Sequence, residues 1–231
     1  MSICVKSILL AGLGSICMAS ANIAFAEETS ISATGYFEKA DGGEIPILAK
    51  MQHALHFGKI KAPNGRIPGA QCTYYYSTFE YPYLATLFEV DSEANVTNAK
   101  DTGGVTPSGC EWDVEQGTAN DEGLGQIEVT CDPERELSVS WRLSGTEDDG
   151  ISLFYTATPD QVGIHNPFEP GVFSETKRDR EFTTSCFQDP DNPRGAGKLE
   201  LFFAASLSID DDAEISEGFK QVGEVLVDVN Y

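Results

Sequence analysis

Positive charge is the property that this sequence has least of. It contains 15 Lys and Arg residues against 37 Asp and Glu residues, which gives a formal net charge of −22. Binding to nucleic acid through the phosphates requires clustered Lys and Arg, and anionic membrane surfaces repel an acidic chain. The composition therefore argues against both partners and predicts a self-repelling surface that faces an outside medium.

Histidine and catalytic motifs are also scarce. The three histidines are His53, His56 and His165. On a helix the H-x-x-H pair His53 and His56 would share a face and hold a metal, but the surrounding residues resemble a strand, where this odd spacing sends the two to opposite faces. No G-x-S-x-G elbow is present, and the many acidic residues single out no glycosidase pair. We therefore expect a non-enzymatic protein without a metal or a cofactor.

The acidic turn 208–214 is a weak candidate for calcium. It carries Asp210, Asp211, Asp212 and Glu214, and carboxylate oxygens are the ligands that calcium prefers. However, no glycine follows at the position that an EF-hand loop requires. A solvated acidic turn is the interpretation that we prefer.

Long hydrophobic runs are missing beyond the N-terminus. Lys6 precedes the apolar run Ile8–Ala11, and Ala24-Phe25-Ala26 is a small-x-small cleavage site before Glu27. This pattern predicts a signal peptide over residues 1–26, a mature chain over 27–231, and export to the periplasm, cell surface or medium of a bacterium. Lipidation at Cys17 is disfavoured because Ile16 stands where a small residue is needed. No other segment has the length of a membrane span.

Four cysteines remain in the mature chain: Cys72, Cys110, Cys131 and Cys186. In an exported chain, four cysteines predict two disulfides. A metal site is the rival, but no two of the four have C-x-x-C spacing. Three pairings are possible. We favour Cys110 with Cys131, which would close the glycine-rich stretch between them and leave Cys72 with Cys186.

Alternating apolar and polar residues dominate the mature chain. Such runs occur at 31–37, 53–60, 72–78, 83–90, 125–131, 136–143, 151–158, 180–187, 198–209 and 224–231. Turn residues separate them, and only 213–219 suggests a helical turn. The pattern predicts an all-β fold, an antiparallel sandwich or barrel, as one domain with a long loop over 101–126.

A tyrosine-rich stretch is the most unusual local composition. It contains Tyr74, Tyr75, Tyr76, Phe79, Tyr81 and Tyr83. Because Tyr74 and Tyr76 point opposite to Tyr75 in a regular strand, we expect at least one set to face outward. Exposed tyrosines would stack on sugars or form the centre of a protein interface. Core packing is the alternative.

The C-terminal stretch is a strand that runs to the last residue. Val225, Val227, Val229 and Tyr231 fall on one face, and Glu224, Asp228 and Asn230 fall on the other. A slip by one residue would bury the two carboxylates. We therefore expect the three valines and Tyr231 to face the core.

Two stretches resemble a known family. "LHFGKI" (55–60) and "AASLSIDDDAEISEGFKQVGEVLVDVNY" (204–231) resemble the opening and the ending of a family of exported bacterial domains of unknown function. That family is similar to spore-coat-protein-U-type and pilin-like immunoglobulin-like sandwiches. The resemblance implies an immunoglobulin-like β-sandwich with a structural or adhesive surface role.

The resemblance also implies partners. Gly218 and Tyr231 resemble the glycine and tyrosine of a pilin C-terminal strand, and "ISATGYF" (31–37), with Gly35, resembles a donor strand. Like subunits and a periplasmic chaperone would then pair with the groove beside the terminal strand. Two alternatives stay open: a sandwich completed by its own N-terminal strand, and a monomeric carbohydrate- or protein-binding module that uses the tyrosines.

Overall fold

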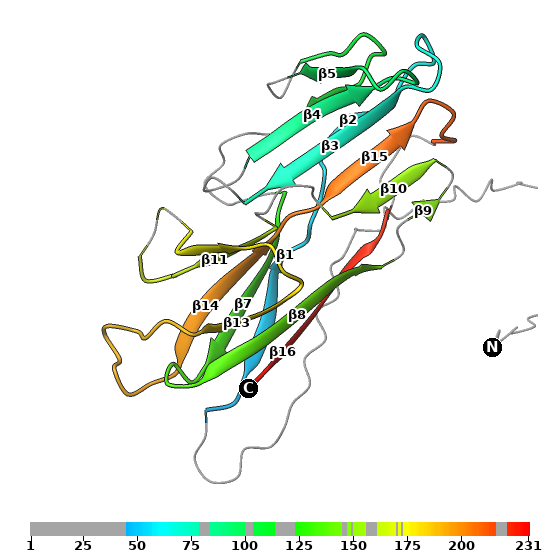
Figure 1. Ribbon diagram of the computed structural model, residues 1–231. Coiled ribbons are helices and arrows are strands. Elements are labelled where there is room, and N and C mark those ends of the chain that lie inside the picture. Colours follow the sequence, from blue (N-terminus) through cyan, green and yellow to red (C-terminus); the bar gives the residue numbers. More distant parts are fainter. Residues whose placement is uncertain are drawn as a thin grey trace, which may run out of the picture.

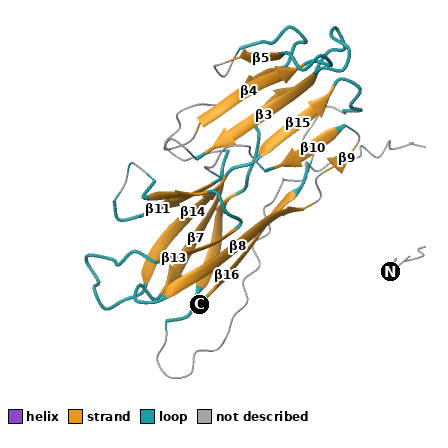
Figure 2. Ribbon diagram, in the orientation of Figure 1, coloured by secondary structure: helices purple, strands orange, loops and turns teal. Residues whose placement is uncertain are grey.

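A computed structural model describes residues 45–78, 84–99, 104–113, 123–144, 147–148, 150–155, 161–169, 171, 173–215 and 221–231. Strands and the loops between them make up this part of the chain, with no helix in it (Figure 2). Several sequence predictions fall outside it: the signal peptide 1–26, the strand 31–37, Tyr81, Tyr83 and Gly218.

Two antiparallel sheets pack together at one end of the molecule (Figure 1). The larger sheet has the order β1 (Leu48–His53), β7 (Gly125–Cys131), β14 (Gly197–Phe203), β11 (Val162–His165), β12 (Glu175–Lys177). The smaller sheet has the order β13 (Glu181–Ser185), β8 (Glu136–Ser144), β16 (Glu224–Asn230). Trp141 of β8 contacts Phe203 of β14 with ring centroids 5.6 Å apart, so the inner faces of the two sheets meet.

A six-stranded sheet forms the other end of the molecule (Figure 1). Its order is β5 (Val96–Ala99), β4 (Leu84–Val90), β3 (Gln71–Ser77), β15 (Ser206–Asp210), β10 (Ile151–Phe154), β9 (Glu147–Asp148). A two-stranded ribbon, β2 (Lys59–Lys61) with β6 (Glu111–Asp113), covers β3. Trp112 of this ribbon lies against Tyr76 with centroids 4.9 Å apart.

The strands β14 and β15 follow one another directly and connect the two ends. Between them, Ala204 and Ala205 are fully buried. The N–H of Ala204 donates to the carbonyl of Gln161 at 2.9 Å, and the N–H of Tyr76 donates to the carbonyl of Ala205 at 3.2 Å. The alternating run 198–209, expected to be one strand, therefore passes from one sheet to another, and its small buried residues allow the close approach.

The predicted all-β antiparallel class and the two disulfides are confirmed, but the favoured pairing is wrong. The bonds join Cys72 to Cys110 and Cys131 to Cys186, with Cα atoms 5.9 Å and 5.8 Å apart. Each disulfide joins a strand to a segment that packs against a face of the sheet to which that strand belongs. The stacking of the sheets, and not proximity along the chain, therefore determines which cysteines pair.

The expected strand over residues 53–60 is divided. β1 ends at His53 and β2 begins at Lys59. Gly58 between them has φ of 60°, a left-handed conformation that a regular strand does not contain. Leu55 and Phe57 are buried all the same. Residues 213–215 of the suggested helical turn are not helical.

Candidate functional site

The described tyrosines of β3 are buried, so the expectation that one set faces outward is wrong. Tyr74 and Tyr76 are 0% and 1% exposed, and Tyr75 is 9% exposed. The reason is that β3 lies between β4 and β15 while the β2–β6 ribbon covers one of its faces. On its other face, Tyr75 packs edge-on against Phe88 of β4, with centroids 6.1 Å apart.

The hydroxyl groups of these tyrosines bond to the main chain of the covering segment. The Tyr74 hydroxyl donates to the carbonyl of Lys61, and the Tyr76 hydroxyl donates to the carbonyl of His56 at 3.0 Å. Burial raises the pKa of Tyr74 well above its usual range, the bond to Lys61 opposes this rise, and the charge of Glu111 adds to it. These groups hold the ribbon on the sheet and offer no surface to a ligand.

The terminal strand β16 buries its valines. Val225, Val227 and Val229 are 1%, 2% and 4% exposed, and the opposite face carries the exposed Asp228 and Asn230. β16 pairs antiparallel with β8 along its whole length. The apolar residues that alternate in the sequence of this strand are therefore the buried ones, and the polar residues between them face solvent.

Tyr231 departs from the expectation that it faces the core. It follows the last residue of β16 and is 36% exposed. Its hydroxyl donates to the carbonyl of Ile45 at 2.6 Å and accepts from the N–H of Asp132 at 2.9 Å. The guanidinium of Arg135 lies 3.7 Å from the ring centroid. Tyr231 thus joins the chain end to the start of β1 and to the turn between β7 and β8.

The smaller sheet has two edges, β13 and β16. β8 lies between them, and neither edge strand has a second strand partner within the described residues. The N–H of Trp141 on β8 donates to the carbonyl of Arg180 beside β13 at 2.9 Å. In an antiparallel ladder the main-chain groups of successive residues point to alternate sides. The even-numbered residues of β8 therefore bond β16, and the N–H and C=O groups of Val225, Val227 and Val229 point to the outer edge.

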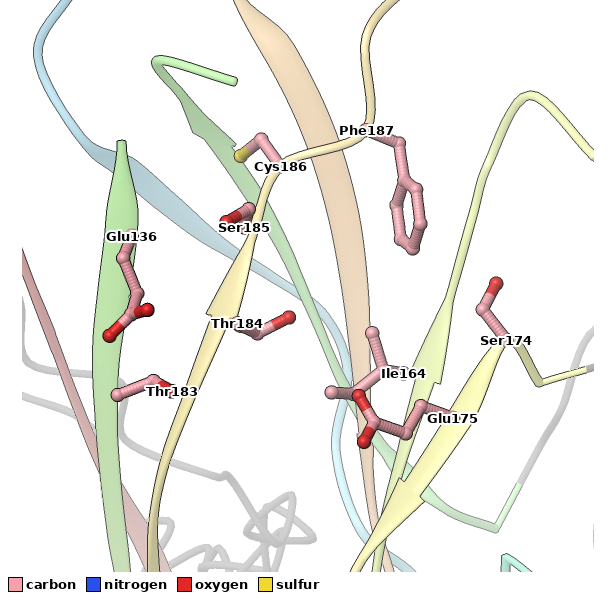
Figure 3. Close-up of a pocket in the computed structure, with 9 residues that line it drawn as sticks. All are labelled: Glu136, Ile164, Ser174, Glu175, Thr183, Thr184, Ser185, Cys186 and Phe187. Carbon is pink, nitrogen blue, oxygen red and sulfur yellow. The ribbon is translucent and has the colours of Figure 1, made fainter. Parts of the chain in front are cut away.

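A pocket of about 380 Å³ opens beside the other edge strand, β13 (Figure 3). Its walls come from both sheets of the sandwich and lie close to the Cys131–Cys186 disulfide. The lining residues are Glu136, Ile164, Ser174, Glu175, Thr183, Thr184, Ser185, Cys186 and Phe187. The lining includes side chains from both faces of β13, such as the outward Thr183 and the inward Thr184, so the space is open to solvent. Sequence reasoning recognised the strand of Thr183 and Thr184 but missed β11 and β12, which are too short to show alternation.

His56, His165 and the acidic turn have structural partners. His165 is buried and its Nδ1 lies 2.6 Å from Oε2 of Glu200. Nδ1 of His56 accepts from the N–H of Gly58 at 3.2 Å. In the acidic turn, Asp211 accepts from the N–H of Gly69 at 2.8 Å. In the part of the chain that the structure describes, no three His, Cys, Asp or Glu residues are grouped to hold a metal ion.

Comparisons with models of protein families, with curated proteins and with solved structures find no match to this chain. The described residues include no helix of the length and hydropathy needed to span a membrane. The functional argument therefore depends on the geometry of the two sheet edges and of the pocket.

Proposed function

We propose that the protein is an exported, non-enzymatic structural or adhesive surface protein, a pilus-like or coat-like subunit with an immunoglobulin-like sandwich that assembles by adding a β-strand to β16. The observation that carries the proposal is that the outer edge of β16 has no strand partner among the described residues. Its outer side presents the main-chain groups of Val225, Val227 and Val229, while their side chains lie in the core. An added strand gains main-chain hydrogen bonds and extends the core at once.

The path of the chain supports this proposal. Residues 1–44 precede the first described residue, Ile45, whose carbonyl is bonded to the Tyr231 hydroxyl at the end of β16. The described part of the chain therefore begins beside the end of β16. In the sequence that precedes it, residues 31–37 alternate in the way that a strand with one buried face requires.

Export is supported by the two disulfides, which persist in oxidising compartments. The acidic composition supports a role outside the cell and argues against binding to nucleic acid. The alternative is a binding module that uses the tyrosine-rich strand. It is disfavoured because Tyr74, Tyr75 and Tyr76 are buried in the core. We therefore retain the subunit proposal.

The test compares the mature chain 27–231 with two double variants of the N-terminal segment by size-exclusion chromatography with light scattering. Ile31→Asp with Phe37→Asp places charges on the face that would enter the core. Ser32→Asp with Thr34→Asp adds the same charge to the opposite face. We expect oligomers from the mature chain and the control pair, and monomers from the first pair.

Two outcomes contradict the proposal. A mature chain that stays monomeric over the whole concentration range would exclude strand exchange between copies. If in addition the first pair lowers the melting temperature while the control pair does not, the N-terminal strand completes its own sandwich. Equal behaviour of the two pairs would show that residues 31–37 have no role at this edge.

A further inference from the structure

The loop between β2 and β3 contains the sequence Asn64-Gly65. Asn64, Gly65 and Arg66 are all exposed. Gly65 has φ of 71°, and apart from its chain neighbours no heavy atom lies within 4 Å of the position that a Cβ would occupy. Its N–H donates to no acceptor among the described residues. The main-chain nitrogen of Gly65 is therefore accessible to the side chain that precedes it.

The side chain of Asn64 is folded back onto the chain that follows it. Its Oδ1 accepts from the N–H of Arg66 at 3.1 Å, which is the turn that asparagine forms with the residue two positions on. This turn keeps Cγ of Asn64 near the nitrogen of Gly65. The N–H of Arg66 also points at the oxygen that becomes negative when this nitrogen attacks Cγ. A donor placed at such an oxygen lowers the barrier to the attack.

We infer that Asn64 is a modification site, at which the protein converts its own asparagine to isoaspartate and aspartate with water as the co-reactant. The nitrogen of Gly65 gives up its proton and forms a bond to Cγ of Asn64. The bond from Cγ to Nδ2 breaks, and Nδ2 leaves as ammonia with that proton. Water then opens the cyclic imide. Cleavage at Cγ gives aspartate, and cleavage at the main-chain carbonyl carbon gives isoaspartate.

The modification acts on the contact between two loops. The N–H of Asn64 donates to the carbonyl of Ser108 at 2.8 Å, and a Cβ on Gly109 would lie 2.5 Å from Nδ2 of Asn64. The N–H of Ser108 donates to Oε2 of the buried Glu89 at 2.8 Å. Isoaspartate adds a methylene group to the main chain, and both products replace the amide by a carboxylate. The modification therefore weakens a contact that the unmodified side chain fits closely.

The inference is independent of the proposed function, because this loop precedes β3 of the six-stranded sheet and β16 belongs to a different sheet. The chain also supplies an internal comparison. Asn98 is exposed and is followed by the small residue Ala99, but it lies in β5 and pairs with Phe88 of β4. A paired strand holds the main chain extended, and it keeps the side chain of Asn98 from closing a ring.

The experiment incubates the mature chain 27–231 at neutral and at mildly alkaline pH and follows each asparagine by peptide mapping with mass spectrometry. A capped synthetic peptide with the sequence of residues 62–67 gives the rate without the fold. We expect Asn64 to react at a rate within about tenfold of the peptide, a difference in barrier of less than about 1.4 kcal/mol. The rate should rise with pH, because the attacking nitrogen must lose its proton, and Asn98 should keep its amide.

Two variants test the geometry. Arg66→Pro keeps the Asn-Gly sequence and removes the N–H that bonds Oδ1, and the same exchange in the peptide is its control. The exchange should slow the reaction about three- to tenfold more in the protein than in the peptide, less than the roughly hundredfold effect of an oxyanion donor in an enzyme, because this site is exposed. Asn64→Gln has a longer side chain that closes a ring slowly, and it should gain no charge during the incubation.

The modified protein carries one more negative charge and is separated by anion-exchange chromatography. It should melt about 2–4 °C below the unmodified protein, the shift that loss of one main-chain hydrogen bond would cause. Asn64→Gln should keep its melting temperature through the same incubation. An unchanged melting temperature of the modified protein would overturn the effect on the contact with Ser108.

Two results would overturn the site itself. One is an Asn64 that keeps its amide after the peptide has been fully converted, and the other is an Asn98 that reacts as fast as Asn64. An equal effect of Arg66→Pro in the protein and in the peptide would remove the role of the Arg66 N–H. If this variant does not fold, the ratio of the rates in the protein and in the peptide still tests the inference.

Discussion

The stability of the terminal strand should depend on which of its faces is changed. We propose two double variants of β16 that keep the chain length. Val227→Ala with Val229→Ala changes the buried face, and Asp228→Ala with Asn230→Ala changes the exposed face. Alanine has a lower β-propensity than valine and a slightly higher one than Asp and Asn, and the whole propensity scale spans only about 1 kcal/mol. A larger difference between the two pairs therefore reports burial.

The expected magnitude follows from the burial of the two valines. Val227 and Val229 are 2% and 4% exposed, and each loses the two methyl groups that distinguish valine from alanine. At about 0.8 kcal/mol per buried carbon, plus a cavity contribution, each exchange costs about 1.5–2.5 kcal/mol. The buried pair should therefore lower the free energy of unfolding by about 3–5 kcal/mol. The exposed pair should change it by less than about 1 kcal/mol.

Thermal unfolding of the mature protein, followed by circular dichroism with both disulfides intact, measures the difference. For a chain of this size, 1 kcal/mol shifts Tm by about 2–4 °C. The buried pair should therefore lower Tm by about 6–20 °C and the exposed pair by less than about 4 °C. Equal shifts would refute the reasoning, because they would show that β16 does not contribute its valines to the core that holds the protein together.

Three further predictions test other parts of the fold. Non-reducing peptide mapping should recover the two disulfides described here and no free thiol, with Glu27 as the first residue of the exported chain; four alkylatable cysteines would contradict this. Tyr231→Phe should cost about 1–2 kcal/mol by removing two hydrogen bonds at the chain end, and an unchanged unfolding midpoint in urea would show that water replaces them. Because burial raises the pKa of Tyr74, the unfolded state releases this proton first, and stability should fall as the pH rises above about 10. Tyr74→Phe should flatten that dependence in urea titrations, and an identical slope would assign it to other groups.

Those strands in which one face is buried could be predicted from the sequence. β8 and β16 alternate between buried and exposed residues along their length, so period two is visible in the residues themselves. β3 also has the right bounds within a residue, but both of its faces are covered. The sequence alone does not state how many layers lie over a strand, which is why the tyrosines were expected at the surface.

The crossing between the sheets could not be predicted for a related reason. Period two continues from β14 through Ala204 and Ala205 into β15, and no Gly, Pro or Asn marks a break. The change of sheet is a tertiary event that depends on bonds to Gln161 and Tyr76, which are distant in sequence. The disulfide pairing was predicted wrongly for the same reason. A short loop between two cysteines lowers the entropic cost of closing the loop only slightly. This preference for cysteines close in sequence is too weak to outweigh the way in which the sheets stack.

The two edges of the smaller sheet differ in what they offer to an added strand, although their main-chain patterns are the same. At β16 the residues with outward N–H and C=O groups are valines, such as Val227, with side chains in the core. A strand added there must bring its own apolar side chains, because they would lie beside that layer. At β13 the corresponding residues, such as Thr183, are exposed, and the inward position Thr184 lies on the side of Ile164 and Phe187. Main-chain pairing would give either partner affinity, so the side chains at each edge, buried valines at β16 and exposed hydroxyl residues at β13, must decide which partner binds where.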